Sequence, residues 1–157
     1  MPEVPGTGIG FDVHSRDPGR ELWLGGVRFE GEGGLRGRSD GDAVCHAVAD
    51  AFLGAAALGD VGQHFPDTDP SLEGIAGTEL LQRTVAILAT NGLAPGGCDV
   101  TVICDSPAIA PYRDELRGRL AEALGIATER VSVKATRPEG LGLSGDGVGC
   151  LAIATVV

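Results

Sequence analysis

The segment Ser39-Asp40-Gly41-Asp42-Ala43-Val44-Cys45-His46 joins an acidic turn to an alanine-rich run, and it decides how the chain is organised. The run from about Asp42 to Leu58 has helical character, and Ser39 or Asp40 is the predicted N-cap. Three polar residues of this helix should lie one turn apart on one face: Asp42, His46 and Asp50. The segment therefore predicts a helix that presents an imidazole next to carboxylates.

A second imidazole lies upstream, in Gly10-Phe11-Asp12-Val13-His14. The opening segment from Thr7 to His14 alternates as a strand, and residues i and i+2 of a strand project to the same side. Asp12 and His14 can therefore converge on one ion while Val13 points into the core. His46 would complete three O and N ligands and leave a fourth tetrahedral position open, which is typical of catalytic zinc. The alternative is a surface aspartate near a core histidine, because isolated residues of these types are common.

Helical and strand patterns alternate along the rest of the chain. Further strands are predicted at Glu21 to Val27 with Phe29, Asp99 to Cys104, Val131 to Ala135, and about Gly149 to Val156. Further helices are predicted at Thr78 to Thr90 and from about Ala110 to Leu124, closing at Gly125, with loops at Gly31 to Gly37 and Phe65 to Ser71. The chain is therefore expected to be one domain, residues 1–157, of the α/β (α+β) class. This pattern alone does not identify a function.

Composition argues against two classes of partner. The formal net charge is −10, so the surface would repel nucleic acid and offers no basic stripe to an anionic membrane. No apolar run approaches membrane-spanning length and no signal peptide is visible, so a cytoplasmic protein is expected. With 4% aromatic residues and 26 glycines, the core must use small aliphatic side chains and is expected to lean on oligomerisation. The cysteines form no CxxC pair and are predicted to be reduced core residues: Cys45, Cys98, Cys104 and Cys150.

Further motifs follow the first helix. They are Asp60-Val61-Gly62, Phe65-Pro66-Asp67-Thr68-Asp69-Pro70, and Val133-Lys134-Ala135-Thr136 with Glu139 and Leu141-Gly142. Read in this order with the zinc motif, the chain resembles the 2-C-methyl-D-erythritol 2,4-cyclodiphosphate synthase family of the non-mevalonate isoprenoid pathway. The resemblance runs from Gly8 to about Val156, and its most specific motifs are Ser39 to Asp42 and Phe65 to Asp69.

The resemblance implies an architecture and a reaction. The subunit would have a ferredoxin-like mixed sheet with helices on one face, and a homotrimer would carry active sites between neighbouring subunits. The substrate would be 4-diphosphocytidyl-2-C-methyl-D-erythritol 2-phosphate, whose 2-phosphate attacks the β-phosphorus, closes the cyclic diphosphate and releases CMP. Zinc would bind Asp12, His14 and His46, and magnesium or manganese would bind Glu139. Without the resemblance, Glu139 would be interpreted as a solvated turn carboxylate.

The resemblance also implies two groups of substrate-binding residues. Those near the zinc and the sugar phosphate are Asp12, His14, Arg38, Ser39, Asp60, Val61, Gly62, Phe65, Pro66, Asp67, Thr68 and Asp69. Those around the cytidine and its phosphates are Cys104, Ser106, Pro107, Ala108, Ile109, Ala110, Thr136, Arg137, Pro138 and Glu139. Asp60 is placed to bind a sugar hydroxyl but could equally cap a turn.

Several family positions carry other residues here. Arg38 stands where the family usually has histidine, and Arg137 where it commonly has a catalytic threonine. Both guanidinium groups suit phosphate oxygens, so both arginines are predicted to be catalytic. Ala108 replaces a customary lysine. Leu143 and Asp146 replace a phenylalanine and an arginine of the family's central trimer cavity, where three inward carboxylates would repel an isoprenoid diphosphate.

Two interpretations from different classes follow. The favoured one is a zinc- and magnesium-dependent cyclodiphosphate synthase that acts on a cytidine diphosphate-linked small molecule. The rival is a non-catalytic or repurposed metal-binding trimer that serves as a pathway scaffold and docks neighbouring pathway enzymes. A generic zinc hydrolase is a weaker third option, because no Glu or His is obviously free to activate water.

Overall fold

The computed structural model describes residues 6–142 and 146–157, and a four-stranded sheet lies at its centre. In spatial order its strands are β1 (Thr7–His14), β8 (Val148–Val156), β6 (Pro95–Ile103) and β7 (Val131–Thr136). Strand β8 is antiparallel to both neighbours, whereas β6 and β7 are parallel, so the sheet is mixed. These are the strands predicted from the sequence, although β6 starts four residues before the predicted Asp99.

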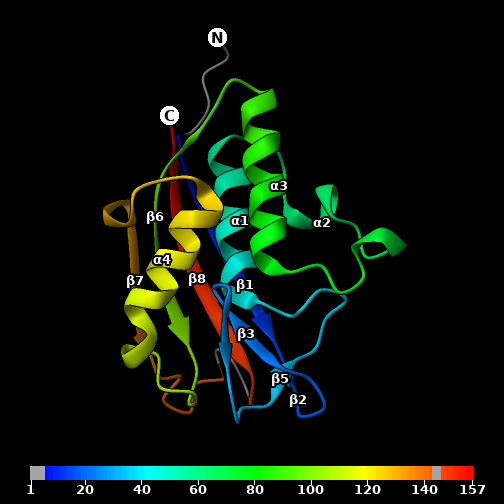
Figure 1. Cartoon of the computed structure of the whole chain (residues 1–157), viewed down its shortest axis with the longest axis vertical. Coiled ribbons are helices and arrows are strands. Elements are labelled where there is room, and N and C mark those ends of the chain that lie inside the picture. The colour runs from blue at the N-terminus through cyan, green and yellow to red at the C-terminus, as the bar shows by residue number, and fades with distance from the viewer. Residues whose placement is uncertain (1–5, 143–145) are drawn as a thin grey trace.

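Three helices cover one face of this sheet (Figure 1). Helix α1 (Ala43–Ala55) lies against β1 and β8, α3 (Gly77–Thr90) packs on α1, and α4 (Arg113–Leu124) packs on α3 and β7. The buried core is built mainly from Ala, Val and Leu, and Phe52 is its largest fully buried side chain. The mixed α/β class and the small aliphatic core are therefore confirmed.

The N-cap of α1 is Asp42, and the prediction of Ser39 or Asp40 is wrong. The fully buried Asp42 carboxylate accepts from the backbone N–H of Cys45 at 3.0 Å. It also accepts from the N–H groups of Gly25 and Gly26, each at 2.8 Å. The Asp42 carboxylate therefore faces the turn at Gly25 and Gly26, and Asp42 precedes the first helical residue, Ala43.

Residues 21–29 form a hairpin rather than the single predicted strand. Strands β3 (Leu22–Leu24) and β4 (Val27–Phe29) pair antiparallel across Gly25 (φ +60°) and Gly26 (φ +77°). A two-residue hairpin turn with positive φ at both positions favours glycine, which is why the chain reverses here. The result is a small, two-stranded sheet whose turn delivers two N–H groups to the start of α1.

Short elements occupy two stretches that were predicted to be loops. Strand β5 (Gly34–Leu35) lies inside the predicted 31–37 loop and pairs with β2 (Arg16–Asp17). The predicted 65–71 loop contains the start of a 3₁₀ turn. The other short elements are α2 (Val61–His64) and the 3₁₀ turns η1 (Pro70–Leu72), η2 (Ala110–Tyr112) and η3 (Thr128–Arg130). The predicted 110–124 helix therefore begins as η2, and it ends at Gly125 in the left-handed conformation, as expected.

Two glycines allow β1 to lie directly against α1. A Cβ on Gly10 would lie 1.9 Å from the Ala47 carbonyl oxygen, and one on Gly8 would lie 2.1 Å from that of Ala51. Real side chains do not tolerate such distances to backbone, so the close approach depends on glycine. The approach brings the end of β1 next to the first turn of α1.

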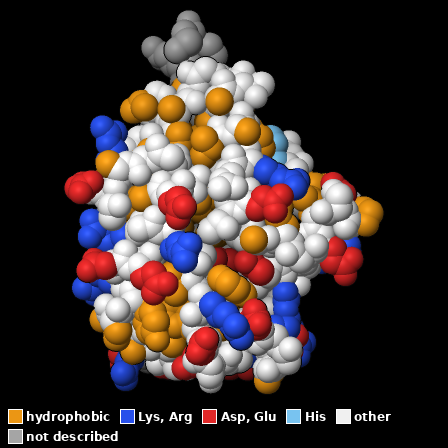
Figure 2. Space-filling view, viewed as in Figure 1, with side chains coloured by type: hydrophobic (Ala, Val, Ile, Leu, Met, Phe, Trp, Pro, Cys, Tyr) orange, Lys and Arg blue, Asp and Glu red, His pale blue; other side chains and the backbone are white. Residues whose placement is uncertain are grey.

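The other face of the sheet carries exposed apolar side chains. They alternate along β1 and β8: Ile9, Phe11, Val13, Leu151 and Ile153. The prediction that Val13 points into the core is wrong, because the glycines, Asp12 and His14 take the helix-facing side and Val13 is 46% exposed. The outer surface on the helix side of the molecule instead carries interspersed charges of both signs (Figure 2).

Two further expectations concern membrane-spanning helices and the residues of the predicted trimer cavity. No helix of the described residues is long and apolar enough to span a membrane. Of the two predicted trimer-cavity residues, Asp146 is exposed, and Leu143 lies outside the described residues.

Candidate functional site

Asp12 and His14 on β1 meet His46 from the first turn of α1. Oδ2 of Asp12 lies 2.7 Å from Nε2 of His14 and 3.4 Å from Nδ1 of His46. The three candidate ligand atoms all lie within 4.8 Å of one another. Asp12 Oδ2 and His14 Nε2 are buried, and neither has a partner with full hydrogen-bonding geometry. Because buried polar atoms are costly without such partners, this arrangement fits a bound metal ion.

The charges within this cluster are strongly coupled in the metal-free protein. Burial raises the pKa of Asp12, but its close contacts with His14 and His46 outweigh burial and lower the pKa to about 2. The pKa of His14 is raised, chiefly by the neighbouring Asp12 carboxylate. Without metal, the carboxylate and a protonated imidazole therefore stabilise each other.

The second nitrogen of each imidazole is held by a neighbour. His14 Nδ1 contacts the carbonyl of Arg36, to which it can only donate. His46 Nε2 lies 3.1 Å from Oγ of Ser39, which also accepts from the N–H of Gly41 at 3.0 Å. When Nδ1 of His14 and Nε2 of His46 each donate a hydrogen bond in this way, the other nitrogen of each ring keeps its lone pair for a metal. These are Nε2 of His14 and Nδ1 of His46.

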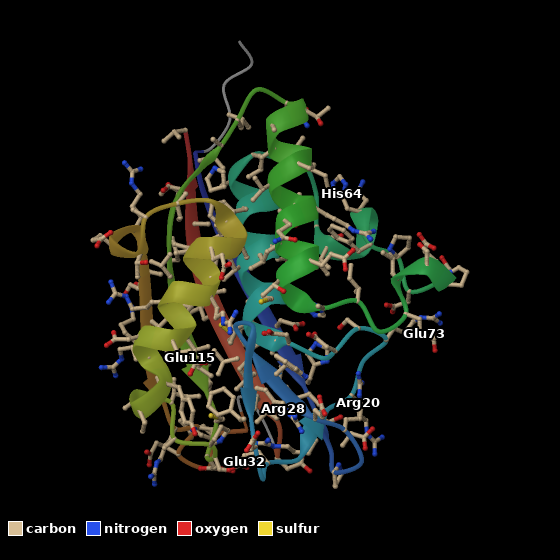
Figure 3. The ribbon with its side chains drawn as sticks, in the orientation of Figure 1. Arg20, Arg28, Glu32, His64, Glu73 and Glu115 are labelled. Atoms are coloured by element: carbon tan, nitrogen blue, oxygen red, sulfur yellow. The ribbon has the colours of Figure 1, made fainter. Side chains whose placement is uncertain are left out.

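The loop that carries Arg38 is fixed through its backbone. The guanidinium of Arg20, labelled in Figure 3, donates to the carbonyl of Gly37 at 2.6 Å and to that of Ser39. The Arg38 carbonyl accepts from the N–H of Gly74 at 2.6 Å. These contacts hold the main chain of the loop, and the Arg38 side chain lines the cavity described next.

Asp40 ties the same loop to α3. Its two carboxylate oxygens accept from the N–H of Asp42 at 3.0 Å and from that of Gly77 at 2.9 Å. Burial, and then the nearby Asp42 charge, raise the pKa of Asp40. Asp40 is therefore a structural member of the acidic motif and not a metal ligand in this structure.

A cavity of about 260 Å³ opens next to the three candidate ligands Asp12, His14 and His46, here called the metal cluster. Its lining includes ten predicted site residues: Asp12, His14, Arg38, Ser39, His46, Val61, Gly62, Phe65, Pro66 and Asp67. Leu72, Ile75 and Leu80 form an apolar wall. The structure thus brings the metal cluster, Arg38 and most of the predicted sugar-phosphate loop to one place.

The remaining residues of that loop lie outside this cavity. Asp60 caps α2 by accepting from the N–H of Gln63 at 2.9 Å, and it lines a smaller adjoining cavity of about 250 Å³. Asp69 caps η1 through the N–H of Ser71 at 2.9 Å. Thr68 is exposed and lines neither cavity. Turn capping, the alternative for Asp60, is therefore observed.

From the sequence, Asp50 is predicted to share a helix face with His46, but it is assigned no role in the site. Its Oδ1 accepts from the N–H of Val61 at 2.8 Å, and it lines the smaller cavity with Asp12, His46 and Asp60. The available signal was its position one turn after His46 on the same helix. Asp50 therefore holds the start of α2 against α1, the helix that carries His46.

A separate cavity of about 340 Å³ lies at the ends of β6 and β7. Its lining residues are Cys104, Asp105, Pro107, Ala108, Ile109, Ala110, Arg113, Ala135, Thr136 and Arg137. The sequence prediction omitted Arg113, which follows the 108–110 segment at the start of α4. This cavity shares no lining residue with the cavity at the metal cluster.

Three residues predicted for this second group do not line its cavity. The Ser106 carbonyl accepts from the guanidinium of Arg16, which also binds the carbonyls of Gly33 and Asp146. Pro138 is buried, and Glu139 is exposed in the left-handed region at φ +52°. Glu139 does not join the metal cluster of its own subunit.

The four cysteines are buried and free. Burial raises the pKa of every one of these thiols, to about 12 for Cys98. A thiol with a raised pKa is a poor nucleophile and a poor metal ligand near neutral pH. The prediction of reduced core cysteines is confirmed.

Comparison with known proteins places this geometry in a family. The YgbB family model matches residues 6–157. A 2-C-methyl-D-erythritol 2,4-cyclodiphosphate synthase from Symbiobacterium thermophilum is 46% identical over 95% of this chain and 96% of its own length. The synthase from Pseudomonas aeruginosa is 46% identical over 96% of this chain and 97% of its own.

Longer relatives also match. A bifunctional IspD/IspF enzyme from Anaeromyxobacter dehalogenans is 52% identical over 96% of this chain, but the chain spans only 39% of that relative's length. Among solved structures, the bifunctional IspDF from Campylobacter jejuni superposes with a TM-score of 0.90 at 35% identity, covering 98% of this chain and 42% of that one.

A solved 2C-methyl-D-erythritol-2,4-cyclodiphosphate synthase in its CDP-bound form has a TM-score of 0.87 and 31% identity. That likeness covers 96% of this chain and 99% of the other. Because the family model covers nearly the whole sequence and the synthases match along their full length, this chain belongs to the YgbB family, as its motifs indicated.

Proposed function

We propose that this protein converts 4-diphosphocytidyl-2-C-methyl-D-erythritol 2-phosphate to 2-C-methyl-D-erythritol 2,4-cyclodiphosphate and CMP, in isoprenoid precursor biosynthesis. The observation that carries the proposal is the convergence of Asp12, His14 and His46 at one wall of a cavity that Arg38 also lines. The full-length synthase relatives support the same reaction. The reaction is an intramolecular phosphoryl transfer that forms no covalent bond to the protein.

In this transfer, an oxygen of the 2-phosphate forms a bond to the β-phosphorus, and the bond from that phosphorus to the CMP oxygen breaks. Zinc held by Asp12, His14 and His46 would supply Lewis-acid stabilisation of phosphate charge. The chain's own task is to hold two phosphates that repel each other at reaction distance. Arg38, fixed at the cavity wall by its backbone, is proposed to neutralise the charge that develops on the transferring group.

A second divalent ion, magnesium or manganese, is proposed at Glu139. Magnesium commonly takes one or two protein carboxylates and completes its shell with substrate phosphates and water. The exposed Glu139 carboxylate fits such a site, which one subunit alone does not complete. The substrate residues around the second cavity, from Cys104 to Ala110 and Thr136 to Arg137, would hold the cytidine end.

We also propose a homotrimer of ferredoxin-like subunits with composite sites. The uncovered apolar face of β1 and β8 supports assembly with further copies, since exposed apolar patches mark interaction surfaces. The two separate cavities support a site completed by a neighbouring subunit. The bifunctional relatives, which carry two enzymes in one chain, support contact with a neighbouring pathway enzyme.

The scaffold alternative explains less of the site. A purely structural metal would be enclosed by four protein ligands, whereas this cluster has three and opens on a cavity. A hydrolase would need a free general base next to the cluster. His64, the remaining histidine, is engaged by the carbonyl of Leu58 at 2.7 Å.

The test is a direct assay. The zinc-loaded protein, given magnesium and the proposed substrate, should release CMP and the cyclic diphosphate in equal amounts. Phosphorus NMR measures both products. Asp12→Asn, which keeps the size of the side chain, should lose both zinc and turnover. Absence of product from fully metal-loaded wild type would overturn the proposal.

Subunit complementation tests the composite site. Mixed trimers of His46→Ala and Glu139→Ala subunits should regain some activity, because a fraction of their sites would then have both intact halves. No recovery in mixed trimers of verified composition would exclude a site shared between subunits.

A further inference from the structure

The arginines of this chain divide into two groups by their contacts. Most donate to a carbonyl or pair with a carboxylate: Arg16, Arg20, Arg28, Arg83, Arg117, Arg119 and Arg130. Within residues 6–142 and 146–157, the guanidinium groups of Arg36, Arg38, Arg113 and Arg137 have no such partner. Three of these four line a cavity. All three are exposed, and in a chain with a formal net charge of −10 such guanidinium groups at cavities are free to bind an anion.

Two of them, Arg113 and Arg137, line the same cavity of about 340 Å³. Arg113 reaches it from the first residue of α4, and Arg137 from the residue after β7. Asp105 is the one carboxylate of the described lining, and it lies within ion-pair distance of neither arginine. The cavity therefore presents two positive groups against one negative group.

The remainder of the lining is suited to a flat or apolar group. Pro107, Ala108, Ile109, Ala110 and Ala135 contribute small aliphatic surfaces. Such a wall, with two guanidinium groups at the same cavity, matches a ligand with a phosphate at one end and an apolar face at the other. Free inorganic phosphate would use only the arginines.

We propose that Arg113 and Arg137 jointly bind a phosphate group of a nucleotide in this cavity, and that Arg113 supplies a cation which the neighbouring Ala108 does not. The inference rests on the proposed function, because it takes the ligand of this cavity to be the cytidine end of the substrate. It adds that the affinity depends on phosphate charge and that Arg113 is a specificity-determining residue.

Calorimetric titration of the zinc- and magnesium-loaded full chain with cytidine, CMP, CDP and inorganic phosphate tests the proposal. Arg113→Ala and Arg137→Ala should each weaken CDP binding by about tenfold, the scale of one hydrogen-bonded charge pair that is partly exposed to water. Cytidine binding should be unchanged in both variants. Arg119→Ala is the matched control, since Arg119 is on the same helix, exposed, and at 4.0 Å from Glu122.

The outcomes separate this inference from the proposed function. Unchanged CDP affinity in Arg113→Ala, or equal weakening of cytidine and CDP, would overturn the phosphate role of that arginine even if wild type turns over the substrate. If wild type bound inorganic phosphate through both arginines but bound CMP and CDP no more tightly than inorganic phosphate, the nucleotide part of the inference would be wrong. The cavity would then be an anion site only. If wild type bound neither phosphate nor nucleotide, the inference would be wrong.

Discussion

Removal of the Asp42 carboxylate should destabilise the protein more than any other single loss of charge on α1. Asp42 is fully buried and accepts three backbone hydrogen bonds, from Gly25, Gly26 and Cys45. In Asp42→Ala, three N–H groups lose their acceptor. At about 1–3 kcal/mol for each donor left unsatisfied, the loss is about 3–9 kcal/mol. This equals a large part of the 5–15 kcal/mol by which typical domains are stable, so the variant should fold poorly.

Asp42→Asn sharpens the test because it keeps one acceptor oxygen. Gly25 and Cys45 donate to the same oxygen, Oδ1, whereas Gly26 donates to Oδ2. An amide that keeps its oxygen in the Oδ1 position therefore loses only the Gly26 bond, and asparagine is also a good N-cap. The expected loss is about 1–3 kcal/mol, about one third of the loss expected for alanine.

Urea unfolding followed by circular dichroism gives both numbers, provided that the slope with denaturant is the same in all variants. Asp114→Asn is the control, since its side chain is 94% exposed in the first turn of α4, and its stability should change by less than about 0.5 kcal/mol. Equal losses for Asp42→Asn and Asp42→Ala, or a loss below about 1 kcal/mol for both, would refute the reasoning. Zinc affinity should fall in parallel, because the cap positions the helix turn that carries His46.

Three other predictions follow from the same contacts. In metal-free protein, the raised pKa of His14 contributes stability that is fully present below about pH 6.5 and is lost as the pH rises through the folded-state pKa. The lowered pKa of Asp12 contributes stability that is present above pH 3.8 and is lost as the pH falls toward about 2. Zinc requires deprotonated imidazole, so thermal melts should show metal stabilising the protein more at about pH 8 than at about pH 6; the opposite trend would contradict the assignment. Gly10→Ala should lower the free energy of unfolding in urea by about 3 kcal/mol or more, because its Cβ would lie 1.9 Å from a backbone oxygen. Gly118→Ala, with open space around it, should raise that free energy by up to about 1 kcal/mol. Similar values for the two variants would exclude the close approach. Cys98, with a pKa of about 12, should resist a thiol reagent at about pH 8 until urea unfolds the chain, and rapid native labelling would disprove its burial.

Local periodicity was sufficient to predict that Asp12 and His14 lie together but not which face of the sheet is buried. Asp12 and His14 were placed together correctly because the two-residue repeat of a strand is a local property. Val13 was misplaced because apolar character was taken as the sign of the buried side. The informative signal was Gly8 and Gly10, whose missing side chains mark the side on which α1 approaches. The apolar residues between them were left on the face without helices.

The choice of N-cap also required tertiary information. Ser39, Asp40 and Asp42 are all suitable capping residues, and propensity does not rank them. What selects Asp42 is the hairpin turn at Gly25 and Gly26, which is distant in sequence and donates two N–H groups to the same carboxylate. That turn was itself missed, because the two glycines were included in a single predicted strand.

The resemblance predicted that the site residues divide into two groups, but no pattern along the chain shows that a single chain keeps these groups in separate cavities. The motif order predicted both groups of substrate residues, yet the structure gives them two cavities that share no lining residue. The proposed substrate, with a sugar phosphate at one end and cytidine at the other, would use both. Among the described residues, each cavity also has guanidinium groups without a hydrogen-bond or ion-pair partner: Arg38 in one, and Arg113 and Arg137 in the other. If the apolar sheet face joins subunits, as proposed, a neighbour can bring its nucleotide cavity to the metal cavity, and positive groups from two chains then surround the phosphates that must react.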